Sequence, residues 1–503
     1  MAFPTWEEEK RSLTLDVPIE LPQEVEREMG PEREASEVPC GKGVSNSKGI
    51  SELEEKAHQE QQELMHALMG TLHHFWGGFS RLFAHVTDPR DPLKITYPLA
   101  SLAFAGTEMF LFRLKARRQI GLLLRNGPSI RKFQALFHVE SFPHGDTLDA
   151  TFSNLEVDQI QTVVSTMTET LIRKKVLYSY RILRVYFIVG VDGTGTVNFD
   201  HRHCPHCLTR TCKGKTLYYH PVLEAKLLTS NGFAFSLMTE FIENPGNKVT
   251  KQDCELKAFY RLAERLKIRF PRLPILLSLD GLFAGGPTFD LCRRYGWKFM
   301  IVLKDDDLPS VNEEFEALSK LEPVNRLIWR TGKEAQIKQV FRWVEDIAYV
   351  DSEKKEHTLS VIECLETKPD KEGQKKTTKF KWVTNGHVSG NNVTTLSNDG
   401  GRIRWKIENE GFNVQKTGGY ELEHAYTNNP NSAKVFYLLL QIAHLLAQLL
   451  YKATLLKRDF LDGLGSAKNL AFRLMEAWRN VRMDQTDITA LTQKRFQIRF
   501  DSS

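Results

Sequence analysis

The sequence of 503 residues lacks a long apolar run, a secretory signal and a regular set of cysteines. Its most apolar stretch, Val435–Leu450, contains Gln441, His444 and Gln448 and is shorter than the about 20 apolar residues of a membrane span. We therefore expect a buried helix there and no membrane association. No cationic segment precedes an apolar one near Met1, so a secretory signal is not expected. Seven cysteines, an odd number, favour a cytoplasmic location over a disulfide framework.

The first sixty residues have few aromatic side chains and are rich in Glu, Pro, Ser and Gly. Such a segment cannot bury enough apolar surface to offset the entropy of ordering, so we expect a mostly disordered leader over 1–60. The leader carries 15 acidic against 7 basic residues, which leaves 61 basic against 48 acidic residues in 61–503. A basic body suits a phosphate-rich partner, although proteins that never bind nucleic acid also carry such a charge.

Residues 61–180 show apolar side chains at intervals of three and four, the spacing of helices. The pattern covers Leu64–Leu72, Leu93–Phe112 and Asp158–Val176. Basic side chains in this block favour either a helical DNA-binding domain or a solvated face. They are Arg113, Lys115, Arg117, Arg118, Arg125, Arg131 and Lys132.

Two short apolar runs end at an aspartate that glycine follows. Val185–Val191 precedes Asp192, and Ile275–Leu279 precedes Asp280. This pattern predicts buried strands with an acid at each C-terminal end, where open α/β sheets place functional groups. Asp-Gly is also a common turn pair, so each aspartate taken alone is equally well explained as a turn former or a helix cap.

The pattern between and after these aspartates predicts a mixed sheet. We expect further strands at Thr216–Leu228, Phe233–Phe241 and Lys298–Leu303, with helices at Gln252–Ile268 and Thr288–Tyr295. Three antiparallel strands, a crossover helix and a parallel strand form the order of the ribonuclease-H-like fold. Asp192 and Asp280 then belong to its first and fourth strands.

A third acid follows in a segment that reads as one helix. Arg404, Glu408 and Phe412 recur at i, i+4 and i+8 and would share a face, with Lys416 one turn further. A carboxylate between cations on one face can hold a metal while the cations hold phosphate. An ordinary surface pair of Arg404 and Glu408 gives the same spacing.

The segment from Arg402 to Lys416 resembles the signature of DDE transposases encoded by bacterial insertion sequences. In that family a Tyr, an Arg, a Glu and a Lys lie along one helix, and the Glu completes an Asp-Asp-Glu metal site. Arg404 and Glu408 match by spacing, whereas Lys416 falls one residue late and Gly401 stands at the Tyr position. The resemblance covers roughly residues 185–450 and rests on order and context.

The resemblance also accounts for the segment between Asp280 and Glu408. Strand patterns at Val340–Val350, Thr358–Glu366 and Lys379–Thr384 indicate an inserted all-β subdomain. The expected organisation is a leader at 1–60, a helical DNA-binding domain at 61–180, a ribonuclease-H-like core at 181–308 and 395–460, a β-rich insertion at 309–394 and a basic helical tail at 461–503.

Three converging carboxylates form a site that favours hard divalent cations, Mg²⁺ or Mn²⁺. Two such ions could activate a water or a DNA 3′-hydroxyl and stabilise the leaving oxygen. We assign Asp192 as the bridging ligand, Asp280 and Glu408 as further ligands, and Arg404 and Lys416 as phosphate-binding residues.

In the resembling family this site cleaves transposon ends and joins them to target DNA. The resemblance therefore implies a nucleoid-associated transposase with double-stranded DNA as partner and a homodimer in the DNA complex. Two other readings are a non-mobile nuclease on the same fold and an inactive, domesticated DNA-binding protein.

A second cluster of metal-ligand side chains lies between the first two predicted strands. It holds His201, His203, Cys204, His206, Cys207, Cys212 and His220. Cys204 and Cys207 form a knuckle-like pair, and Cys212 with one histidine would complete a tetrahedral zinc site, with His203 preferred to His220. Metal would order a loop without its own apolar core. The alternative is a flexible surface loop that contains cysteines.

Overall fold

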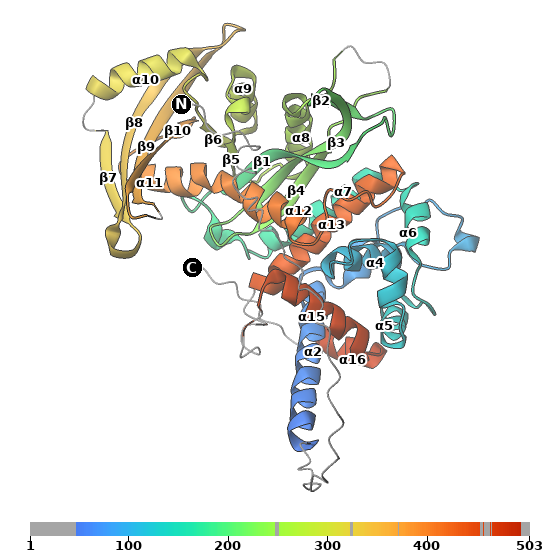
Figure 1. Ribbon diagram of the computed structural model, residues 1–503. Coiled ribbons are helices and arrows are strands. Elements are labelled where there is room, and N and C mark those ends of the chain that lie inside the picture. Colours follow the sequence, from blue (N-terminus) through green and yellow to red (C-terminus); the bar gives the residue numbers. More distant parts are fainter. Residues whose placement is uncertain are drawn as a thin grey trace, which may run out of the picture. The chain divides into compact units, whose positions relative to one another are not determined.

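The chain divides into two units, Met1–Leu53 and Glu54–Ser503. The second unit contains a mixed sheet of parallel and antiparallel strands (Figure 1). The computed structural model describes residues 47–246, 251–321, 325–370, 372–452, 456, 463 and 465–493. The strand order is β2-β3-β1-β5-β6-β10-β9-β8-β7, and β4 pairs with the other side of β3. The strands are β1 (Phe187–Phe199), β2 (Leu208–Cys212), β3 (Lys215–Leu228), β4 (Ala234–Phe241), β5 (Ile275–Leu279), β6 (Lys298–Val302), β7 (Arg326–Thr331), β8 (Ile337–Val350), β9 (Glu356–Pro369) and β10 (Lys375–Thr384).

Helices cover this sheet and form a block beside it. The longer ones are α2 (Ser47–Trp76), α4 (Leu99–Leu111), α5 (Gly127–Phe137), α6 (Gly145–Phe152), α7 (Val157–Arg173), α8 (Glu255–Arg269), α9 (Gly286–Tyr295), α10 (Pro309–Leu321), α13 (Pro430–Lys452), α15 (Ala467–Asn480) and α16 (Gln485–Gln493). The mixed α/β class expected from the sequence is therefore observed. The helices expected between 61 and 180 are present, and part of the leader, residues 47–60, belongs to α2 rather than to a disordered segment. Residues 1–46 lie outside the described residues.

The central strands follow the apolar runs of the sequence. β1 pairs antiparallel with β3 and parallel with β5, and β5 pairs parallel with β6. A short connection that contains Asn231 joins β3 to β4, which pair antiparallel. Strand β2 was not predicted, because its five residues are mostly exposed and carry no apolar run.

The segment between Asp280 and Glu408 extends the same sheet. β10 pairs antiparallel with β6, and β9, β8 and β7 follow in turn (Figure 1, yellow to orange). The segment is not all-β as expected, because Pro309–Leu321 forms α10, which buries Val311 and Phe315 and packs along β8. Its amphipathic spacing, with one apolar face toward the strands, is that of a covering helix.

The two faces of the central strands contact different partners. Val189 and Leu277 belong to the main core, which includes Phe259 and Leu262 of α8. The alternate residues Ile188 and Leu276 belong to a second cluster on the opposite face, because side chains along a strand alternate. That cluster contains Leu396, Ile403, Ile407 and Phe412, so the helical segment after the insertion covers this face.

The long apolar helix α13 lies inside the block of helices. By length and composition it could cross a membrane, but 83% of its most apolar window is buried within the protein. It packs beside α4 and α7 (Figure 1) and confirms the buried helix expected at Val435–Leu450. Its polar residues are paired: Gln441 accepts a hydrogen bond from Lys226, and Gln448 accepts one from the Ala234 backbone.

Several basic side chains of the helical block serve the fold rather than a surface. Lys132 is fully buried and donates to the Trp478 carbonyl at 2.7 Å. The Arg113 guanidinium lies over the Tyr420 ring, and Arg117 pairs with Asp149 at 2.8 Å. Lys115, Arg118, Arg125 and Arg131 remain on the surface.

Candidate functional site

Asp192 lies within a strand rather than at its end, which corrects the expected position. β1 continues through Phe199, and Gly193 and Thr194 keep their pairing with β3. The glycines suggested a turn, but here they extend the strand to a register shift between Gly195 and Val197. Alternation still places Asp192 on the same face as Ile188, the face that the helical segment after the insertion covers.

Asp280 directly follows β5, as predicted. Its carboxylate accepts a hydrogen bond of 2.6 Å from the Leu282 backbone and so caps a short 3-10 helix, Gly281–Phe283. Asp280 caps this helix and is also near Asp192, because its charge raises the pKa of Asp192. Asp192 belongs to β1, and Asp280 follows β5, the parallel neighbour of β1.

Glu408 lies in an irregular helical segment instead of the regular α-helix that was expected. Arg402–Arg404 is a 3-10 helix and Ile407–Asn413 is a π-helix, with α12 (Val414–Thr417) after it. The segment approaches β1 closely at Gly190, where an added Cβ would lie 2.7 Å from Leu228 and 3.6 Å from Ile407. The missing side chain at Gly190 therefore lets the residue next to Glu408 pack on the sheet near Asp192.

Arg404 forms an ion pair with Asp192, with Nη1 3.3 Å from Oδ2. The two side chains are 18% and 26% exposed, and the buried Nε of Arg404 has no hydrogen-bond partner in the described part of the chain. Burial raises the pKa of Asp192 to about 6, and the charges of Glu408 and Asp280 add to the increase. Arg404 and the Gly193 N–H oppose it, so Asp192 lies between two acids and one cation.

Glu255, at the first turn of α8, is a fourth acid of this site that the sequence reading missed. Burial raises its pKa, and the charges of Asp192 and Asp280 raise it further. An added Cβ at Gly193 would lie 2.3 Å from the Glu255 carboxylate, so Gly193 provides the space that this side chain occupies. The sequence carries little signal for Glu255, because an acid in the first turn of a helix is common.

Asp192 is near enough to each of the other three acids for their charges to interact, and Glu255 also interacts with Asp280. Among the described residues, the four acids do not form a group of three whose oxygens all lie within 4.8 Å of one another. Mutual repulsion between carboxylates accounts for this spacing, and Arg404 relieves part of it at Asp192. Their hard oxygen donors fit Mg²⁺ or Mn²⁺, whose positive charge would relieve the rest.

Lys416 lies on α12 and pairs with Glu423 at 3.4 Å. Glu423 is 55% exposed, so the pair is at the surface. Lys416 pairs with Glu423 rather than with one of the four acids, and the positive charge that acts on Asp192 is that of Arg404. Of the two predicted phosphate-binding residues, the structure therefore brings only Arg404 to the acids within the described residues.

The cysteine and histidine cluster assembles with a different membership from the one expected. The Sγ atoms of Cys204 and Cys207 lie 3.6 Å apart, and His220 Nε2 lies 3.4 Å and 3.2 Å from them. His203 brings a ring nitrogen within 4.8 Å of the ligand atoms of Cys204 and His220. The group whose ligand atoms all lie within 4.8 Å of one another is His203, Cys204 and His220, and Cys207 joins it through Cys204 and His220. Cys212 is exposed at the end of β2, where it pairs with Lys215.

No family model and no curated protein matches this chain. The function is therefore inferred from the residues and their arrangement.

Proposed function

We propose that this protein is a metal-dependent DNA transposase of the DDE type, which cleaves transposon ends and joins them to target DNA. The observation that carries the proposal is the meeting of Asp192, Asp280, Glu408 and Arg404 from three separate elements. Asp192 and Arg404 are 212 residues apart in sequence, so a surface pair between neighbours on one helix does not explain the contact.

The order of the central strands supports a ribonuclease-H-like core. In β4-β3-β1-β5-β6 the first three are antiparallel neighbours and the last three are parallel. The first acid belongs to the central strand and the second follows its parallel neighbour, which is the arrangement that the resemblance implies. Asp280 lies at a strand end, where ligand sites in open α/β sheets collect because loops there carry polar groups that the core excludes.

The chemistry that this site would support is phosphodiester hydrolysis and transesterification. Two bound Mg²⁺ or Mn²⁺ ions would supply an activated oxygen nucleophile and stabilise the leaving oxygen. Asp192, which the charges of both Asp280 and Glu408 reach, is the candidate for the shared ligand, and Asp280 and Glu408 would each hold one ion. The Arg404 guanidinium, whose Nη1 lies 3.3 Å from Asp192 and whose Nε has no hydrogen-bond partner among the described residues, is suited to bidentate binding of a phosphate.

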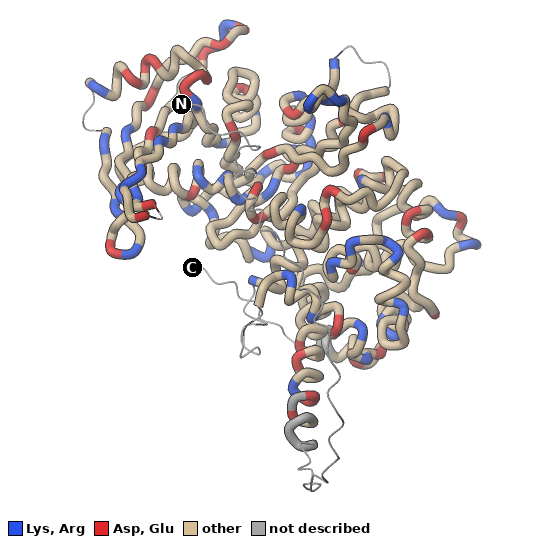
Figure 2. Tube along the Cα trace, viewed as in Figure 1, with Lys and Arg blue, Asp and Glu red and all other residues tan. Residues whose placement is uncertain are grey.

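Surface charge on the insertion supports a nucleic-acid partner. Lys and Arg recur along β7–β10 (Figure 2), and exposed ones include Arg326, Arg330, Lys333, Lys368, Lys375 and Lys376. Clustered basic side chains neutralise DNA phosphates. We propose that the insertion and Arg404 contact the same double-stranded DNA, in a homodimer on that DNA, within the cytoplasm.

The test is strand cleavage and joining by the purified full chain. The substrate is a DNA fragment that carries the gene with its natural flanks, with Mg²⁺ and a supercoiled target plasmid. We expect cuts at the ends of the element and their insertion into the plasmid. Insertion that survives in Asp192→Asn, Asp280→Asn and Glu408→Gln would contradict the site assignment.

The outcomes also separate the other candidate functions. Cleavage without joining would identify a non-mobile nuclease on the same fold. Binding in a mobility-shift experiment without any cleavage, with Mg²⁺ or Mn²⁺, would identify an inactive DNA-binding protein and overturn the proposal.

A further inference from the structure

We infer that Cys204, Cys207, His220 and His203 bind one structural zinc ion, which links the β1–β2 connection to β3. The inference does not depend on the proposed transposase activity, because it rests on a different set of residues. It also replaces the ligand set that the sequence alone favours, in which Cys212 takes the place of His220.

The distances among three of these residues are within about 0.4 Å of those of a tetrahedral site. Zinc bonds of about 2.3 Å to sulfur and about 2.0–2.1 Å to nitrogen put neighbouring tetrahedral ligands about 3.5–3.8 Å apart. The Sγ–Sγ distance of Cys204 and Cys207 is 3.6 Å, and His220 Nε2 lies 3.4 and 3.2 Å from the two sulfurs. A disulfide would require about 2.05 Å between the sulfurs.

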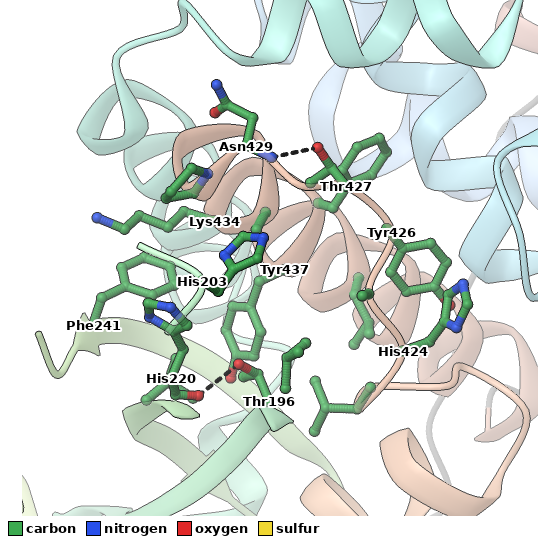
Figure 3. Close-up of a pocket in the computed structure, with 18 of the residues that line it drawn as sticks. Thr196, His203, His220, Phe241, His424, Tyr426, Thr427, Asn429, Lys434 and Tyr437 are labelled. Carbon is green, nitrogen blue, oxygen red and sulfur yellow. Dashed lines mark hydrogen bonds between the residues drawn. The ribbon is translucent and has the colours of Figure 1, made fainter. Parts of the chain in front are cut away.

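His203 is the fourth ligand, because the other histidines of the loop have different partners. His206 Nδ1 contacts the Asn244 carbonyl at 2.9 Å, and His201 contacts Asp200 at 2.6 Å. His203 stacks on Phe199 with ring centroids 4.3 Å apart, which directs it toward His220. Figure 3 shows the two imidazoles side by side.

The surroundings hold the ligands as a second shell does in known metal sites. The Cys204 N–H donates to Cys207 Sγ at 3.4 Å, and the buried Asn244 side chain donates to the Cys207 carbonyl at 2.9 Å. Thr196 Oγ1 donates to the His220 carbonyl at 2.7 Å (Figure 3). Cys207 is 0% exposed and Cys204 8% exposed, in a loop without regular structure.

A closed set of four protein ligands indicates a structural rather than a catalytic ion. The ion would join the loop after β1 to β3 where Val197 pairs with His220, five positions beyond Asp192 on the same strand. His203 and His220 also line a pocket of about 80 Å³ between β3 and α13, whose wall includes Phe241, Lys434 and Tyr437 (Figure 3).

Metal analysis of the purified full chain tests the inference. We expect about one zinc ion per chain, falling at least tenfold in Cys207→Ser and in His220→Asn. Cys212→Ser is the matched control, because Cys212 lies in the same stretch of sequence but outside the cluster; His206→Asn controls for the histidine change. Full zinc content in Cys207→Ser, or its loss in Cys212→Ser, would overturn the assignment.

Cobalt substitution in the wild-type chain tests the zinc site even if the variants do not fold. Zinc is removed from the wild-type chain with a chelator and Co²⁺ is added to the folded protein. We expect the visible bands of tetrahedral cobalt and a thiolate charge-transfer band, both lost on adding zinc. Absence of these bands, with Cys204 and Cys207 recovered as a disulfide, would instead identify a redox pair and contradict the zinc proposal.

Discussion

The carboxylate site and the cysteine–histidine cluster differ in how they are built. The cluster draws its ligands from residues 203–220, and its closest atoms lie 3.2–3.6 Å apart. The acids come from β1, β5, α8 and the π-helix, and their oxygens stay further apart. The cluster is drawn from one short stretch of sequence, whereas the acids come from separate elements and repel one another. One arrangement suits a fixed structural ion, and the other suits ions that arrive with a substrate.

Replacement of one of the acids should have the largest effect on cleavage. Asp192→Asn, Asp280→Asn or Glu408→Gln should each lower Mg²⁺-dependent cleavage by about 1,000-fold, or about 4 kcal/mol of transition-state stabilisation. The fold should persist, because the acids do not support one another. Circular dichroism and cleavage rates on the same preparations measure both quantities. Glu410→Gln, two residues from Glu408 and paired with Lys452, is the control and should cleave normally.

A substitution in the cysteine–histidine cluster should instead lower the stability of the protein. Cys207→Ser should lower the free energy of unfolding by about 3 kcal/mol, since it removes a metal ligand from a buried site. Urea unfolding monitored by fluorescence gives this value, with Cys212→Ser as the reference. If Cys207→Ser instead abolished cleavage by a fully stable protein, the distinction between the two sites would be lost.

The pH dependence of stability tests the electrostatics of the carboxylate site. The pKa of Asp192 is raised from its ordinary value of 3.8 to about 6 in the fold. Its stabilising contribution is therefore fully present below pH 4 and is lost as the pH rises through about 6, at most about 3 kcal/mol. Unfolding in EDTA between pH 4 and 8 measures it. Asp192→Asn should lack this part of the pH dependence; an unchanged profile would show that Asp192 titrates normally.

Glu255 should have a smaller effect than the three predicted acids. Glu255→Gln keeps the size of the side chain but removes a charge that acts on Asp192, so cleavage should fall about tenfold with a higher Mg²⁺ requirement. Titration of the rate with Mg²⁺ separates the two quantities. Glu264→Gln, on the same helix, is the control. A 1,000-fold loss would make Glu255 a ligand equal to the others.

The smallest effect is expected at Lys416. Its ion pair with exposed Glu423 is worth about 0–1 kcal/mol, so Lys416→Ala should change cleavage less than about fivefold. Arg404→Ala in the same assay provides the contrast, because Arg404 contacts Asp192. Equal losses in both variants would show that Lys416 reaches the DNA in the complex.

The sequence predicts the parts of the fold that local patterns determine. Ile275–Leu279 reads as a buried strand and is β5, because a continuous apolar run has few other solutions. Asp192 was placed at a strand end because Gly193 and Gly195 imitate a turn. The π-helix around Glu408 was not predictable, since its close contact with Gly190 depends on β1, which is more than 200 residues away.

The cysteine–histidine cluster and Glu255 also depend on contacts between residues that are distant in sequence. Cys204 and Cys207 were identified because a knuckle is a local motif. His220 was ranked below His203, and Cys212 was included, because proximity in sequence was the available guide. The antiparallel pairing of β1 with β3 brings His220 back to the loop, while β2 carries Cys212 away. Glu255 was missed for a related reason: an acid in the first turn of a helix is common and carries no signal alone.

The pairing of β10 with β6 has a consequence for protein engineering. Because Trp382, Val383 and Thr384 bond to the edge of β6, the insertion is not a module that can be excised between two loops. Its removal would leave β6 with unpaired backbone groups beside apolar side chains, a template for aggregation. Shortened forms of this protein should therefore keep β10, or place a charged residue or a proline on the exposed edge of β6.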